Sequence, residues 1–193
     1  MNDKPKLLDV RIYGDAILGK IAKPVETFDD ELRSFVRDMV YTMYQRDGVG
    51  LAAPQVGQSV RIFVMDTQWS KEEGKPNPTV LINPELLSGE GDYEIEEGCI
   101  SVPGIYARVK RFNKISYSYL DLDKKRHEAE AEGYDAVVFQ HEFDHLNGVL
   151  FVDRLSKLPL LKIKRKLKAL QSTAENGVNI RSEIYGKQVS SKE

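Results

Sequence analysis

The sequence predicts an α+β fold, with mostly antiparallel strands around a central helix and a further helix near the C-terminal end. Three observations support this prediction. Apolar residues recur with helical spacing between positions 29 and 47, as in an amphipathic helix. Alternating apolar residues and polar turns between 93 and 132 indicate strands. An apolar segment at 136–146, which ends before Gly148, indicates a buried helix.

The elements of the first half follow from local patterns. Thr27 or Asp29 can cap the first helix, and Gly48 can end it. The segment 48–57 contains three glycines and a proline, so we expect a loop there. Strands are predicted at 8–13, 60–66 and 79–82, with a polar, mobile insert at 69–78.

The second half alternates strands and helices. Ile115, Tyr117 and Tyr119 lie on one face of a predicted strand, and a polar turn at 121–126 leads to a second, more polar strand. Asp135 is a suitable N-cap for the helix at 136–146. Pro159 stands at the start of the last predicted helix, which reaches about residue 171.

The composition is that of one ordinary globular domain. The chain has 193 residues, of which 41% are hydrophobic and 30% charged, and its formal net charge is −2. We expect a single domain over 1–171 and a polar, flexible tail over 172–193. The balanced charge gives no case for a DNA or membrane partner, and no apolar run approaches the roughly 18 residues needed to span a bilayer. With no signal-peptide pattern, we expect a cytoplasmic protein.

The helix at 136–146 carries an H-E-x-x-H motif, His141-Glu142-Phe143-Asp144-His145. Residues four apart stack on one helix face, so both imidazoles can reach one metal ion. Glu142 is rotated about 100° from His141, beside the metal, where it can take a proton from a bound water. The chain has only three histidines, so a chance match is rare. We therefore predict a central metal-binding helix rather than two ordinary core histidines.

Two histidines leave such a catalytic site without its third protein ligand. No histidine follows His145, and acidic residues downstream are few. The single cysteine, Cys99, excludes an internal disulfide, and its thiolate is a good ligand for zinc or ferrous iron. Most lone cysteines are small buried hydrophobic residues. Beside an incomplete two-histidine site, however, Cys99 is the leading third ligand.

The segment 48–57 has residues that could contact a substrate. Gly50 would allow a substrate backbone to approach closely. Gln55 offers an amide N–H to a developing oxyanion. A plain glycine-rich connector fits the composition equally well, so both interpretations stay open.

Three segments, in this order, resemble the signature motifs of the peptide deformylase family: 50–55 (GLAAPQ), 97–101 (EGCIS) and 140–145 (QHEFDH). The resemblance extends over about residues 8–170. Each motif is moderately specific, whereas the ordered triplet is very specific. Two small departures occur, because Ile100 stands where leucine is frequent and Pro54 where some members have threonine.

The resemblance implies a metal-dependent hydrolase that removes the N-formyl group from formyl-methionyl nascent polypeptides and releases formate. One divalent metal ion, commonly ferrous iron, with zinc, nickel or cobalt as alternatives, would be held by Cys99, His141 and His145. Glu142 would act as the general acid and base. The Gln55 side chain and the Ile100 backbone N–H would stabilise the oxyanion.

The resemblance also implies substrate contacts within the catalytic domain at 1–171. Gly50 would contact the substrate main chain. Val49, Val138 and His141 are candidates for the wall of an apolar pocket that takes the methionine side chain. Ordinary core packing is the alternative for these three.

The segment 158–170 is the one local charge asymmetry. Seven Lys and Arg and no acid lie between 154 and 170, and leucines and isoleucine give the helix an apolar side. The plain interpretation is a docked helix with a solvated basic face. The sharper hypothesis is contact with ribosomal RNA near the emerging peptide.

Two other functional classes compete with this one. A cysteine hydrolase would use Cys99 as nucleophile, His141 as base and Gln55 in the oxyanion hole, which leaves His145 and Glu142 without a role. A non-enzymatic, RNA-associated protein would use the motif as a structural metal site, which needs a fourth protein ligand and a closed site.

Overall fold

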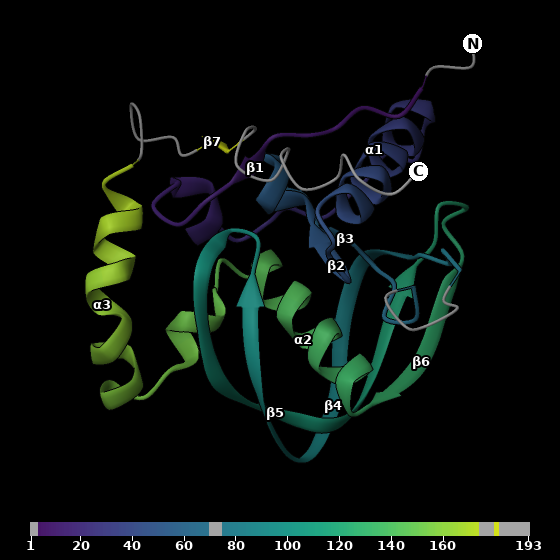
Figure 1. The fold of residues 1–193 in the computed structure, drawn as a ribbon. Coiled ribbons are helices and arrows are strands. Elements are labelled where there is room, and N and C mark those ends of the chain that lie inside the picture. Colours follow the sequence, from purple (N-terminus) through teal and green to yellow (C-terminus); the bar gives the residue numbers. More distant parts are fainter. Residues whose placement is uncertain (1–3, 70–74, 174–179, 182–193) are drawn as a thin grey trace.

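The computed structural model describes residues 4–69, 75–173 and 180–181. It confirms the α+β fold with a mostly antiparallel sheet. Within the described residues, five antiparallel strands pair in the order β2-β3-β4-β5-β6. Figure 1 shows helix α2 at the centre of the molecule, with the long strands β4 and β5 curving around it. Helices α1 and α3 lie on opposite sides of this central unit (Figure 1).

The elements have the following bounds. The sheet consists of β2 (Gly50–Ala52), β3 (Ile62–Met65), β4 (Thr79–Cys99), β5 (Val102–Leu120) and β6 (Arg126–Glu132). The helices are α1 (Asp30–Gln45), α2 (Tyr134–Leu146) and α3 (Lys157–Gln171), with 3-10 turns η1 (Ala16–Gly19), η2 (Ala53–Val56) and η3 (Phe151–Arg154). A separate two-stranded ladder joins β1 (Val10–Arg11) to β7 (Ile180–Arg181).

Helix α1 confirms the amphipathic pattern. The Asp29 carboxylate accepts the Leu32 N–H at 2.9 Å and caps the helix, as one of the two predicted caps. The buried face of α1, with Met39 and Met43, packs on β2 and β3. The helix ends at Gln45, three residues before the glycine that was expected to end it.

The extents of several strands were predicted wrongly. The strand expected at 79–82 is the start of the 21-residue β4, which pairs with the 19-residue β5. Opposite charges face each other across the outer part of this hairpin, as at Glu94 and Lys110, so no apolar alternation marks the strands there. The strand expected at 8–13 shrinks to two residues, because the Leu8 N–H bonds to the Thr42 hydroxyl instead of a neighbouring strand.

The glycine-rich segment 48–57 is not a plain loop. Its residues Gly50–Ala52 form β2, which pairs with β3, and Ala53–Val56 form the turn η2. Two helix starts also differ from the prediction. Helix α2 begins at Tyr134 after Gly133, so Asp135 lies in the first turn rather than at the N-cap. Helix α3 begins at Lys157, so Pro159 lies in its first turn, where proline needs no N–H partner.

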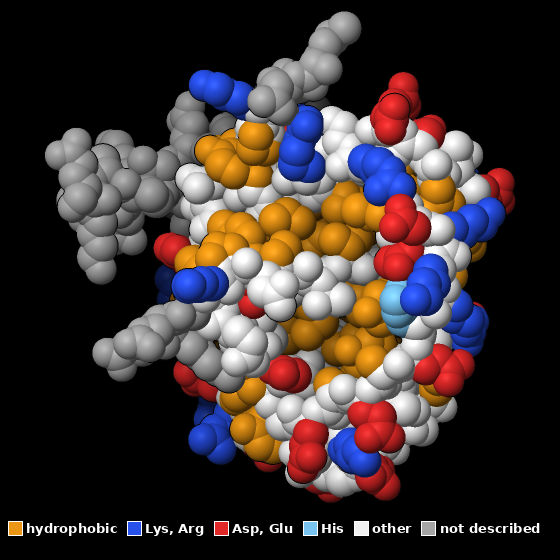
Figure 2. Space-filling model, turned by 90° about the vertical axis from the view of Figure 1, so that its right-hand side faces the viewer, with side chains coloured by type: hydrophobic (Ala, Val, Ile, Leu, Met, Phe, Trp, Pro, Cys, Tyr) orange, Lys and Arg blue, Asp and Glu red, His pale blue; other side chains and the backbone are white. Residues whose placement is uncertain are grey.

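The core surrounds α2 on several sides. Phe139 is fully buried, with its ring 5.3 Å from that of Phe63 and 4.2 Å from that of Tyr117. Figure 2 shows one face of the molecule, on which hydrophobic side chains gather near the middle and charged side chains lie mainly around them. None of the helices in the described part of the chain is long and apolar enough to cross a membrane.

Candidate metal centre and substrate cavity

The three predicted metal ligands come together in the structure. Cys99 is the last residue of β4, and His141 and His145 lie one turn apart on α2. One donor atom from each residue lies within 4.8 Å of the other two. The Cys99 Sγ is 3.4 Å from the His145 Nε2. One thiolate and two imidazoles form a donor set suited to zinc or ferrous iron.

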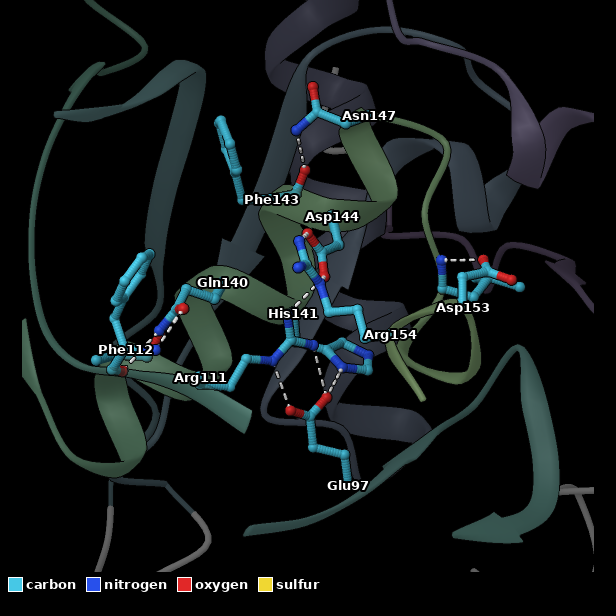
Figure 3. A network of polar contacts seen from close by, with 12 residues as sticks. Glu97, Arg111, Phe112, Gln140, His141, Phe143, Asp144, Asn147, Asp153 and Arg154 are labelled. Atoms are coloured by element: carbon cyan, nitrogen blue, oxygen red, sulfur yellow. Dashed lines mark hydrogen bonds and ion pairs between the residues drawn. The ribbon is translucent and has the colours of Figure 1, made fainter. Parts of the chain in front are cut away.

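A buried ionic network fixes the orientation of His141 (Figure 3). Its Nδ1 lies 2.8 Å from Oε2 of Glu97, which leaves Nε2 to face the other two donors. Arg111 donates to both Glu97 oxygens, at 2.7 and 2.8 Å, and to Asp144 at 2.5 Å. Arg154 also donates to Asp144. Burial raises the pKa of Glu97, but hydrogen bonds from Arg111 and His141 outweigh it and hold that pKa at about 2.

The first residue of the third motif, Gln140, joins α2 to β5. Its side-chain amide accepts the Phe112 N–H at 3.0 Å and donates to the Phe112 carbonyl at 2.9 Å (Figure 3). The helix that carries both histidines is therefore held against the sheet by two bonds to one residue.

Glu142 is buried beside the metal group and lines a cavity. Burial raises its pKa to about 7, although the charge of His141 opposes this. Its Oε2 atom has no hydrogen-bond partner among the described residues. A carboxyl group with a pKa near neutrality can both accept and return a proton.

Gly50 has a structural reason to be glycine. A Cβ atom at this position would lie 2.4 Å from Oε1 of Glu142, which is much closer than real contacts allow. The β2 backbone therefore passes directly against the Glu142 carboxyl group. From the sequence we expected a substrate backbone close to Gly50, whereas in the structure the close neighbour is the Glu142 side chain.

Gln55 projects from η2 toward the metal group. Its Nε2 donates to the Cys99 Sγ at 3.3 Å and to the Ser101 hydroxyl at 3.2 Å. Its Oε1 accepts the Ala52 N–H at 2.8 Å, which fixes the amide so that its NH₂ group faces the site. Ile100 follows Cys99 directly and lines the same cavity.

The cavity has a volume of about 360 Å³. It is lined by eight of the nine residues that sequence analysis singled out, namely Val49, Gly50, Gln55, Cys99, Ile100, Val138, His141 and Glu142. The ninth, His145, is only 1% exposed. Sequence analysis missed two aromatic residues in the lining, Tyr106 and Tyr134, because one aromatic residue in a strand or helix start gives no functional signal.

Comparison with known proteins identifies the family. Residues 7–160 match the family model described as polypeptide deformylase. The chain belongs to this family. Peptide deformylases are metal-dependent hydrolases that remove the N-formyl group from nascent chains, so the predicted activity and enzyme class are confirmed, and the non-enzymatic alternative is wrong.

The relatives cover nearly the whole domain. A peptide deformylase from Alkalilimnicola ehrlichii is 48% identical over 164 residues, which are 85% of this chain and 90% of the relative. The crystal structure of the Thermus thermophilus enzyme is 39% identical, with a TM-score of 0.80, and covers 88% of this chain and 100% of its own. A Met-Ala-Ser-bound structure of the Acinetobacter baumannii enzyme is 36% identical, with a TM-score of 0.73 and coverage of 79% and 100%.

Proposed function

We propose that Cys99, His141 and His145 hold one divalent metal ion, ferrous iron in the cell, for which zinc, nickel or cobalt can substitute. The proposal rests on the three donor atoms that lie within 4.8 Å of one another at one side of the cavity. The surroundings fit a cation. Burial lowers the pKa of His145, which favours the neutral imidazole, the form that binds metal. The buried Glu142 carboxyl group lies beside the donors and adds negative charge there when it is ionised.

The residues around the cavity then divide the work of deformylation. When bound, a divalent ion acts as a Lewis acid and lowers the pKa of water at the site. Glu142 takes the proton of the attacking water and returns it to the leaving amine. The Gln55 Nε2 and the Ile100 N–H donate to the oxyanion that forms on the formyl group.

Substrate contacts complete the proposal. Val49 and Val138 form part of the wall of the pocket for the methionine side chain, and Gly50 faces the substrate main chain. All three residues line the cavity. The Acinetobacter baumannii relative has been crystallised with Met-Ala-Ser, a peptide of the kind that deformylation releases.

Removal and return of the metal test the assignment. Chelation of anaerobically purified protein is expected to abolish cleavage of formyl-Met-Ala-Ser, and added Fe²⁺ is expected to restore it in proportion to bound metal. Metal content and formate release are measured on the same samples. Full turnover by metal-free protein would instead support Cys99 as a nucleophile, and stoichiometric metal without turnover would contradict the proposed site.

We place the enzyme in the cytoplasm. We assign the catalytic domain to 1–171 and the tail to 172–193, and most of this tail lies outside the described residues.

The basic segment 158–170 is proposed to contact ribosomal RNA. Its helix, α3, is less docked than its apolar pattern predicted, because only Leu167 is buried, whereas Leu158 and Leu161 are 74% and 65% exposed. An exposed helix with many cations can bind phosphates.

Charge reversal on α3 tests this contact. Replacing Lys162, Lys164 and Lys166 together with glutamate is expected to reduce co-sedimentation with ribosomes at least tenfold at low salt, since each lost phosphate contact weakens binding. Cleavage of formyl-Met-Ala-Ser should stay unchanged, because none of these lysines lines the cavity. Unaltered co-sedimentation would remove the ribosome from the proposal.

A further inference from the structure

Asp66, the first residue after β3, is a buried carboxylate outside the cavity lining. Its side chain accepts four hydrogen bonds. The donors are the Tyr44 hydroxyl at 2.7 Å and the backbone N–H groups of Gln68, Trp69 and Asn77 at 3.1, 3.1 and 2.7 Å. Burial raises the pKa of Asp66, but these hydrogen bonds outweigh it and lower that pKa. Asp66 is therefore an ionised centre that holds both ends of the polar insert.

Asp66 and Trp69 also form hydrogen bonds to the segment that precedes β2. The indole Nε1–H of Trp69 donates to the Gly48 carbonyl at 3.0 Å. The Asp66 N–H donates to the next carbonyl, that of Val49, at 2.9 Å. The Trp69 ring also meets the Tyr44 ring edge-on, with centroids 5.1 Å apart. Two successive carbonyls of one segment are thus fixed from one side.

The segment held in this way is a wall of the cavity. Gly48, Val49 and Gly50 all line it. Gly50 passes so close to Glu142 that a Cβ atom would lie 2.4 Å from Oε1. With glycines on both sides of Val49, the backbone has little intrinsic rigidity, so its place depends on external bonds.

We propose that Asp66 and Trp69 are positioning residues for substrate binding, which hold the segment 48–50 where it can meet the formyl-methionyl end of the peptide. They do not contact the reacting atoms. Their effect passes through the Gly48 and Val49 carbonyls. This inference rests on the proposed use of the cavity as the substrate site.

Two substitutions test the inference. Trp69→Phe keeps an aromatic ring beside Tyr44 but removes the indole N–H that reaches Gly48, together with part of the ring system. Asp66→Asn keeps the shape of the side chain and removes the negative charge that accepts the four hydrogen bonds. Both are expected to raise KM for formyl-Met-Ala-Ser about three- to tenfold, while kcat and bound metal change less than about twofold. Ser88→Ala, which removes an exposed hydrogen bond to Ser116 outside the cavity, is the control and should leave KM unchanged.

A binding measurement separates positioning from general destabilisation. Trp69 is the only tryptophan, so tryptophan fluorescence reports on the surroundings of this residue alone. Titration with the peptide Met-Ala-Ser should change the fluorescence of the wild type to a plateau, which gives the Kd for this peptide. In the Asp66→Asn variant we expect this Kd to rise by the same factor as KM. Wild-type KM in both variants, or reduced kcat with unchanged KM, would overturn the inference while the proposed function stands. Absence of Met-Ala-Ser binding and turnover in the metal-loaded wild type would overturn both.

Discussion

Glu142→Gln is expected to lower kcat for formyl-Met-Ala-Ser by roughly 10²–10⁴-fold. Glutamine keeps the volume of the side chain in the space beside Gly50 but cannot accept and return a proton. The buried carboxyl group has a pKa of about 7, so it is suited to both steps. Turnover and metal content, measured on the same preparation, should show lost activity with full metal occupancy.

The matched control is Glu96→Gln. Glu96 also lines the cavity but is exposed, so the same chemical change there should leave kcat within about twofold of the wild type. A Glu142→Gln enzyme that retained most of its activity would contradict the assigned acid and base role. Loss of activity together with loss of metal would instead indicate that Glu142 supports the metal group.

Arg111→Leu is expected to destabilise the fold by about 3–5 kcal/mol, because it leaves Glu97 and Asp144 buried without their shared cation. Arg111 is 4% exposed and donates to both carboxylates. Since Glu97 orients His141, we also expect the affinity for metal to fall roughly 10–100-fold. Urea unfolding of the metal-free protein measures the first effect, and metal titration measures the second.

Arg154→Leu provides the comparison. Arg154 donates to Asp144 but is 45% exposed at its side chain, and Arg111 remains in place to neutralise that carboxylate. Its loss should therefore destabilise the fold much less and leave metal affinity almost unchanged. Equal effects of the two substitutions would show that Asp144, rather than the contact between Glu97 and His141, controls the site.

The cluster of Cys99, His141 and His145 could be predicted because its geometry is largely local. Helical spacing alone puts His141 and His145 on one face, and a shortage of other ligands led to the only cysteine. The position of Glu142 beside these candidate ligands follows from the same helix. The register of the β4–β5 hairpin, which brings Cys99 to that helix, could not be predicted from the sequence.

The supporting residues were not predictable for a different reason. Arg111 stands in a basic, surface-like stretch, and nothing near it in the sequence shows that Glu97 and Asp144 will enclose it. Asp66 and Trp69 border a polar insert that composition describes only as a loop. In both cases the partners are remote in sequence, and the interaction exists only once the tertiary structure has formed.

The arrangement of the proposed metal ligands has a consequence for the folded chain as a whole. Cys99 and His145 are 46 residues apart in the sequence, and β5, β6 and most of α2 lie between them. An ion held by both would close this stretch into a ring, much as a disulfide does, and would favour compact forms of the chain. The lone cysteine, which cannot crosslink the protein with another cysteine, would then do so through the metal.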